Sequence, residues 1–169
     1  IRVVVLLKIE KDKLAIESIS QLFQLIDNNK ETMSRLGVLL SSLNDYSRIK
    51  SILTELHSDY PNDYYIALYT AKFALKFDDY PQTEKYINQA LSVKPNDETS
   101  ILIKATLYKK MGLSDKELQV YEEGISHIDN TDKGSLIRLE YIKLLLETNQ
   151  RQKAIEQLKT IVDMNKTNS

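Results

Sequence analysis

Short patterns of residues return every 34 positions along this chain. The tripeptide Pro61-Asn62-Asp63 recurs as Pro95-Asn96-Asp97, and Asp129-Asn130 follows at the same interval. Small residues keep the same period at Gly37, Ala71 and Ala105. A period of this length predicts an array of similar structural units, each packed mainly against its neighbours.

Each unit is predicted to consist of two amphipathic helices, because its apolar residues recur at intervals of three and four. Asp63 and Asp97 are expected to cap the helices that follow them, and Pro81 fits the first turn of a helix. Pro61 and Pro95 are expected to end the preceding helices. Only four glycines and three prolines occur in 169 residues, which also favours helices joined by short connections.

The repeat covers nearly the whole chain, so residues 1–169 are predicted to form a single solenoid domain. The expected units are 1–29, which is partial, and then 30–63, 64–97, 98–131 and 135–166. A three-residue insertion at Asp132-Lys133-Gly134 shifts the phase before the last unit. The chain starts at Ile1 rather than Met, and both ends are expected to be cut from a longer protein. Self-association through Ile1, Val3, Val5, Ile161 and Val162 at these ends is a further expectation.

Composition disfavours several classes of function. The 23 basic and 24 acidic side chains give a formal net charge of -1, so nucleic acid is not an expected partner. Pentatricopeptide RNA-binding repeats have a similar length, but the missing basic groove argues against them. The apolar run Val3 to Leu7 is too short to span a bilayer, and no direct membrane contact is expected.

We find no motif for catalysis, for a cofactor or for a metal. The absence of cysteine excludes thiolate ligands, disulfides and a cysteine nucleophile. His57 and His127 are the only histidines, and neither has a partner at metal-binding spacing, so a packing or surface role is expected for both. The chain is therefore expected to be no enzyme and to hold no cofactor and no metal.

The phased residues resemble the tetratricopeptide repeat family. Its motif has a Leu-Gly pair and an aromatic residue in the first helix, and Ala, a large apolar residue, Ala and Pro in and after the second. The matches are Leu36-Gly37, Pro61, Ala71, Ile87, Ala90, Pro95, Ala105, Tyr108, Gly112, Tyr121 and Gly124. The resemblance implies an all-α fold, a right-handed superhelix of antiparallel helix pairs with four full repeats and a truncated first one. Ile49, Thr83 and Glu117 replace the motif's Ala, which predicts looser packing there.

In this family the concave surface is lined mainly by the first helix of each unit. By resemblance, the protein- or peptide-binding residues here are Tyr65, Leu68, Tyr69, Lys72, Leu75, Lys76, Leu102, Thr106, Lys109 and Lys110. Tyrosines and lysines together suit an extended acidic or amphipathic peptide. For any one of these residues, a solvated helix face or packing between repeats is the alternative. The Lys and Asn arrangement that clamps a C-terminal carboxylate in some members is absent from the matching positions.

The expected function is a protein-interaction scaffold or adaptor. A second resemblance, carried by residues 136–154 and Ala67–Ala71, is to long bacterial tetratricopeptide proteins, some of them outer-membrane lipoproteins. Those adaptors present cell-envelope substrates to periplasmic proteases, which implies a periplasmic or outer-membrane location. A cytoplasmic scaffold that assembles a complex and the non-catalytic regulatory arm of a larger enzyme remain the alternatives.

Overall fold

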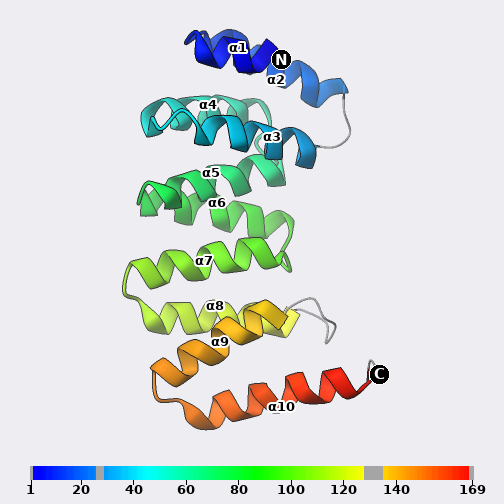
Figure 1. Ribbon diagram of the computed structural model, residues 1–169, viewed down its shortest axis with the longest axis vertical. Helices are drawn as coiled ribbons and strands as arrows, with labels where there is room; N and C mark the ends of the chain where they lie inside the picture. The colour runs from blue at the N-terminus through cyan, green and yellow to red at the C-terminus, as the bar shows by residue number, and fades with distance from the viewer. Residues whose placement is uncertain (1, 26–28, 128–134, 168–169) are drawn as a thin grey trace. The chain divides into compact units, whose positions relative to one another are not determined.

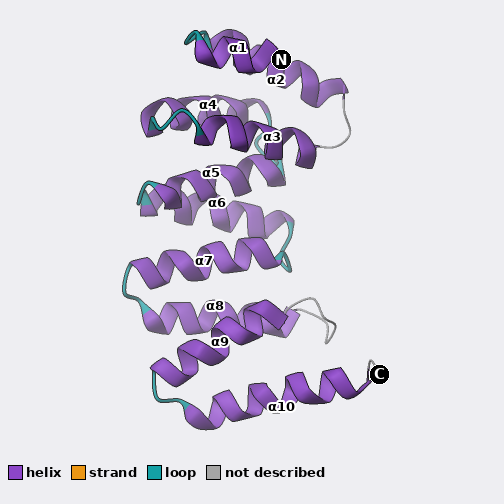
Figure 2. Cartoon of the chain, in the orientation of Figure 1, coloured by secondary structure: helices purple, strands orange, loops and turns teal. Residues whose placement is uncertain are grey.

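The computed structural model describes residues 2–25, 29–127 and 135–167, and the predicted insertion at 132–134 lies outside them. Helices make up the described part of the chain, which contains no strand (Figures 1 and 2). They are α1 Arg2–Lys8, α2 Asp12–Leu25, α3 Asn29–Ser41, α4 Tyr46–Asp59, α5 Tyr64–Lys76, α6 Tyr80–Val93, α7 Glu98–Lys110, α8 Ser114–His127, α9 Ser135–Glu147 and α10 Arg151–Thr167. The predicted all-α class, built from successive helix pairs, is confirmed.

The backbone repeats with the same period as the sequence. At the turn inside each helix pair, one residue adopts a left-handed conformation: Glu10, Asn44, Asp78, Gly112 and Asn149, with φ of 58°, 49°, 58°, 70° and 59°. The residue after it often donates its backbone N–H to a carbonyl five positions earlier, as from Asp79 to Ala74 at 2.9 Å and from Leu113 to Tyr108 at 2.9 Å. This is the Schellman arrangement, which satisfies carbonyls at the end of a helix and sets the turn into the next one.

Side-chain caps start several of the helices. Asp63 accepts a hydrogen bond from the backbone N–H of Ile66 at 2.9 Å, and Asp97 accepts one from Ser100 at 2.7 Å. Both were expected from the sequence. Asp45 caps α4 in the same way, through the N–H of Arg48 at 3.1 Å. The helices before Pro61 and Pro95 end two residues ahead of each proline, and Pro81 lies in the first turn of α6, as predicted.

The chain divides into two compact units, Ile1–Val93 and Lys94–Ser169. The assignment of one solenoid domain to all 169 residues therefore stays a prediction. In the first unit, α2 packs against α4, and α5 packs against α3, α4 and α6. Their shared core holds Leu7, Ala15, Ile16, Ile19, Met33, Leu36, Leu40, Ile49, Ile52, Leu53, Leu56, Ile66 and Phe73.

An ion pair fastens the first helices of this unit to its core. The guanidinium of Arg48 on α4 contacts both carboxylate oxygens of Asp12 on α2, at 2.5 and 2.6 Å. The same guanidinium donates to the backbone carbonyl of Leu7 at the end of α1. A bidentate arginine–carboxylate contact fixes geometry better than a single charge pair, so Arg48 orients the α1–α2 turn against α4.

In the second unit, α8 packs between α7 and α9, and α9 packs against α10. Gly124 allows α8 to approach α7 closely, because a Cβ atom there would lie 2.9 Å from Cγ2 of Ile101. On its other side, α8 places Tyr121 beside Tyr141 of α9, with ring centroids 6.2 Å apart. Gly124 and Tyr121 both belong to sets of small or large apolar residues that recur every 34 positions along the sequence.

Candidate protein-binding groove

A cleft of about 400 Å³ lies between α3 and α5 in the first unit. Its lining residues are Ser34, Gly37, Val38, Ser41, Tyr69, Lys72, Phe73 and Lys76. Gly37 opens the space for the ring of Tyr69, because a Cβ atom at this position would lie 2.8 Å from Cδ1 of that ring. We call this cleft the α3–α5 groove.

The α3–α5 groove combines an exposed apolar side chain with two cations. Val38 is 71% exposed, the highest value among the exposed large apolar residues that the structure describes. Lys72 and Lys76 are exposed one helical turn apart on α5, and none of the residues that line the groove is acidic. Lys72 Nζ lies 5.6 Å from the centroid of the Tyr69 ring, and the residue is exposed.

The structure sorts the predicted α5 residues into different environments. Tyr69, Lys72 and Lys76 line the groove, and Tyr65 is half-buried. Leu68 and Leu75 are each only 8% exposed, because α5 is covered by helices on several sides. These two leucines therefore support the groove from within the core and offer little surface to a partner.

The remaining predicted residues lie on α7, in the second unit. Leu102 is half-buried, and Thr106, Lys109 and Lys110 are exposed. The hydroxyl of Thr106 donates to the carbonyl of Leu102 at 2.7 Å, within the same helix. Their role in binding stays a prediction.

Sequence reasoning missed the α3 wall of the groove. Ser34, Val38 and Ser41 lie 34 residues before the predicted Leu68, Lys72 and Leu75. Subtracting 34 from the numbers of the predicted α5 residues would have identified these three α3 residues.

A second cleft in the first unit is more apolar. It has a volume of about 320 Å³ and is lined by Val3, Ile19, Leu22, Glu31, Thr32, Arg35, Leu36 and Leu39. Arg35 and Glu31 pair at 2.5 Å at its exposed edge, so their charges offset each other. It therefore lacks the uncompensated charge of the α3–α5 groove.

The described residues offer no metal site, since no group of three or more His, Asp or Glu side chains converges among them. His57 packs edge-on against the ring of Tyr86, with centroids 5.0 Å apart, and burial lowers its pKa, with a smaller contribution from Lys85. His127 is the last residue of α8, and its side chain lies outside the described part. None of the described helices is long and apolar enough to cross a membrane.

Comparison with known proteins identifies the fold. No family model and no curated protein sequence matches the chain. Solved structures do match: a crystal structure of MamA is 15% identical, with 96% of this chain and 94% of MamA covered and a TM-score of 0.65. MamA from Desulfovibrio magneticus RS-1 gives 14% identity, coverage of 96% and 90%, and a TM-score of 0.61. A tetratricopeptide repeat protein from Parabacteroides merdae is 14% identical over 95% of this chain and 61% of its own, with a TM-score of 0.54.

The chain has a tetratricopeptide-like fold. The expectation drawn from Leu36-Gly37, Ala71, Ala90 and the other phased residues is thus confirmed for the architecture. In the tetratricopeptide-like arrangement, α3 and α5 are the first helices of successive pairs.

Proposed function

We propose that this chain is a protein-interaction scaffold whose α3–α5 groove holds an acidic segment of a partner protein. The observation that carries the proposal is the exposed Val38 on α3 facing the same cleft as Lys72 and Lys76 on α5. A helix wall of this kind offers apolar contact and two adjacent cations. The tetratricopeptide-like fold supports the same function, because stacked helix pairs present extended surfaces suited to binding.

The chemistry of the groove favours a carboxylate-rich ligand over a purely apolar one. Lys72 and Lys76 would pair with acidic side chains, while Val38 and the ring of Tyr69 would contact an aliphatic one. The two ammonium groups would attract acidic side chains of a partner over about a Debye length, which is roughly 8 Å at physiological ionic strength. Binding should therefore weaken as salt is raised.

Affinity capture from the source organism, followed by titration of the captured partner, tests this function. The test variant is the double substitution K72E/K76E, and the matched control is K11E/K13E, which reverses two exposed lysines elsewhere in the first unit. We expect the test variant to lose the partner and the control to keep it. Equal capture by both variants would contradict the groove. Leu68 is unsuited to such a test, because a glutamate at this buried position would disrupt the core.

The sequence resemblance to envelope adaptors adds a finer role, which is the presentation of envelope substrates to a protease. Its test is whether a protease is recovered together with the captured partner in wild-type samples and is lost with K72E/K76E. A partner recovered without any protease would restrict the function to scaffolding.

A further inference from the structure

We propose that the outer face of the α9–α10 hairpin is a second docking surface, which binds an acidic amphipathic helix of a partner protein. This outer face comprises five large apolar side chains that are 45–52% exposed: Leu139, Leu146, Ile155, Leu158 and Val162. It lies in the second unit and shares no residue with the α3–α5 groove.

The position of Leu158 is built to be covered by a helix. The equivalent residues of the other helix pairs are Ile19, Leu53, Ile87 and Tyr121. They are 1%, 1%, 0% and 5% exposed, whereas Leu158 is 45% exposed. The position is thus covered by neighbouring helices in each of the other pairs and open in this one.

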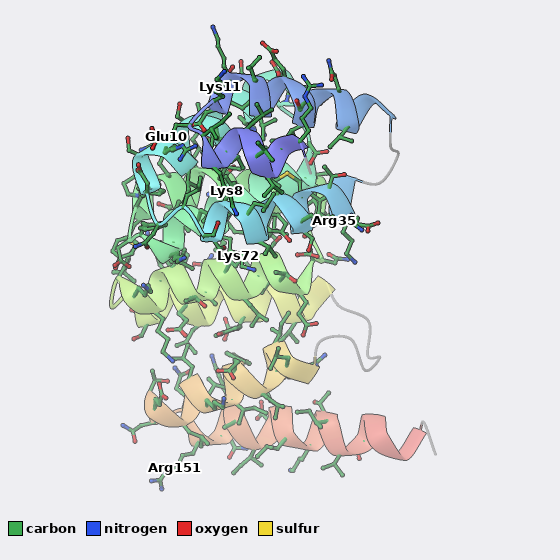
Figure 3. All side chains as sticks on the ribbon, turned by 45° about the horizontal axis from the view of Figure 1, so that its top comes forward. Lys8, Glu10, Lys11, Arg35, Lys72 and Arg151 are labelled. Carbon is green, nitrogen blue, oxygen red and sulfur yellow. The ribbon has the colours of Figure 1, made fainter. Side chains whose placement is uncertain are left out.

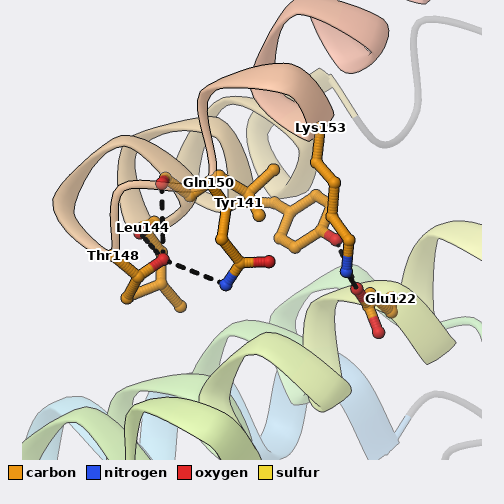
Figure 4. Close-up of polar contacts among 7 residues, drawn as sticks. Glu122, Tyr141, Leu144, Thr148, Gln150 and Lys153 are labelled. Atoms are coloured by element: carbon orange, nitrogen blue, oxygen red, sulfur yellow. Dashed lines mark hydrogen bonds and ion pairs between the residues drawn. The ribbon is translucent and has the colours of Figure 1, made fainter.

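The contact between α8 and α9 shows what such a helix looks like. α8 places Tyr121 beside Tyr141 of α9 and buries Leu118, in the positions that Leu158 and Ile155 hold on α10. From α9, the hydroxyl of Tyr141 donates to Oε1 of Glu122 at 2.6 Å, at the edge of this apolar contact (Figure 4). In this contact the covering helix, α9, thus supplies an apolar row and one polar group, the Tyr141 hydroxyl that bonds Glu122.

The apolar rows of α9 and α10 share one side of the hairpin. Tyr141 and Lys153 both reach toward α8, where they meet Glu122 (Figure 4). Leu139 lies about 160° around α9 from Tyr141, and Leu158 about 140° around α10 from Lys153, at about 100° per residue. Both rows thus lie on the sides of their helices opposite the Glu122 contact, and the proposal places one helix across them.

Two cations accompany the apolar row of α10, whereas α9 carries Glu140, which pairs with Lys143, and Glu147; the charges of α10 favour an acidic partner. Lys159 stands where α8 carries Glu122, so the carboxylate of the α8–α9 contact is replaced by an exposed ammonium. Arg151 begins the row of Ile155 and Leu158, and its side chain extends outward from α10 (Figure 3). A covering helix with glutamates flanking its apolar row would pair with both cations.

The same charges disfavour a second copy of this chain. A two-fold pairing of α10 centred on Leu158 would bring the two Lys159 side chains together. The exposed Val5 and Ile9 at the first helix are no better suited, because Arg2 and Lys8 accompany them. Like charges held at an interface oppose association. The self-association predicted from the sequence accordingly becomes the competing outcome of the test.

Two synthetic peptides based on α9 provide the probe, because α9 is the helix that covers the equivalent face of α8. The acidic peptide has the 13-residue sequence of Ser135–Glu147 with R138E and K143E, and the basic peptide has E140K and E147K instead. Fluorescence anisotropy measures the binding of each labelled peptide to the whole chain at low and at physiological salt. Circular dichroism verifies that every variant is folded.

Three variants separate the outer face from other surfaces. L158K removes the centre of the apolar row, and E156K places the same residue on the opposite side of α10, where Glu156 is exposed. K159E reverses the selecting charge. K72E/K76E reports any binding of the acidic peptide in the α3–α5 groove.

We expect the acidic peptide to bind more tightly than the basic one, and L158K to weaken it about tenfold or more through the loss of apolar burial. In the K72E/K76E background, which removes binding of the acidic peptide in the α3–α5 groove, E156K should leave this affinity unchanged, and K159E should shift the preference toward the basic peptide. Equal affinity for both peptides, no binding, or an L158K variant that binds like the wild type would overturn the proposal. A dimer in sedimentation that L158K dissociates would assign the face to a second copy instead.

Discussion

Tyr46 donates a hydrogen bond of 2.8 Å to Oδ2 of Asp79 and so ties the start of α4 to the start of α6. Lys50 donates to the same oxygen at 2.9 Å, while the other carboxylate oxygen accepts from the backbone N–H of Gln82 at 3.3 Å. Asp79 therefore caps α6 through the N–H of Gln82 and holds α4 through Tyr46 and Lys50. Burial raises the pKa of Asp79, but the hydrogen bonds from Lys50 and Tyr46 outweigh it and leave the pKa below its ordinary value.

Removing the carboxylate should cost more than removing the hydroxyl. We predict that Asp79→Ala lowers the free energy of unfolding by about 2 kcal/mol, since a cap and a charged hydrogen bond are both lost. Tyr46→Phe keeps the ring stacked on Phe77 and should cost about 1 kcal/mol. Urea denaturation of the two single variants and the double variant measures the coupling. Strictly additive effects would show that the hydrogen bond contributes nothing.

Glu117 is a buried carboxylate at a position that is apolar or small in the other pairs. The equivalent residues are Ala15, Ile49, Thr83 and Ala154. Burial raises the pKa of Glu117; Lys109 on α7 opposes this rise, and Glu140 and Glu147 on α9 add to it. The folded state thus favours the protonated acid. Its contribution to stability is fully present below the unfolded pKa and is lost as the pH rises through the folded pKa.

We therefore predict that Glu117→Gln stabilises the protein at pH 7 by about 1 kcal/mol, because a buried charge is replaced by a neutral group of similar shape. The gain should shrink as the pH falls toward 4, where the wild type is itself protonated. Thermal unfolding across this pH range makes the measurement. Glu156→Gln, at an exposed position, is the control and should show no such trend. A variant with the same advantage at pH 4 as at pH 7 would refute this explanation.

The sequence predicted the helix pairs and their caps well because these are local features. Asp63, Asp97 and Pro61 act within one turn of their own position, so their roles follow from residue type and spacing. The period of 34 residues then carries each assignment to the neighbouring pairs. Even the left-handed turn residues, such as Asn44 and Gly112, obey this period.

The exposure of the α5 residues expected to bind a partner was harder to predict, because exposure depends on how many neighbours a helix has. α5 packs against three helices and buries nine of its thirteen residues, among them Leu68 and Leu75. Helical phase identifies which residues share a face, but it cannot tell how wide the buried arc is. Val38 shows the opposite case: it was not predicted to bind a partner, yet it is 71% exposed, because the groove opens beside Gly37.

His57 should make stability fall in mild acid. Its Nδ1 is buried without a hydrogen-bond partner among the described residues, and burial, followed by Lys85, lowers its pKa. Unfolding frees the imidazole to take up a proton, so stability should decline as the pH drops below the ordinary histidine pKa of 6.5. Tyr86 and Lys85 on α6 are the aromatic and charged neighbours that face it.

We predict that His57→Leu removes this decline between pH 7 and pH 5 without loss of stability at pH 7. Chemical denaturation at both pH values tests it, with the wild type measured beside the variant. If the variant loses as much stability in acid as the wild type does, another group is responsible for the decline.

The residues with left-handed backbone at the turn inside each helix pair give a final prediction, in which two substitutions change the free energy of unfolding in opposite directions. Glu10 has φ of 58°, a conformation that costs a residue with a Cβ about 1 kcal/mol, whereas Gly112 adopts φ of 70° without that penalty. Glu10→Gly should therefore raise the free energy of unfolding by up to about 1 kcal/mol, offset in part by the greater entropy of glycine in the unfolded chain. Gly112→Ala should lower it by about 1 kcal/mol, although a Cβ atom there would meet nothing within 4 Å. Because space is open around Gly112, a measured loss reports the cost of the left-handed backbone less the smaller entropy of alanine in the unfolded chain, and an unchanged stability would show that the turn relaxes to another geometry.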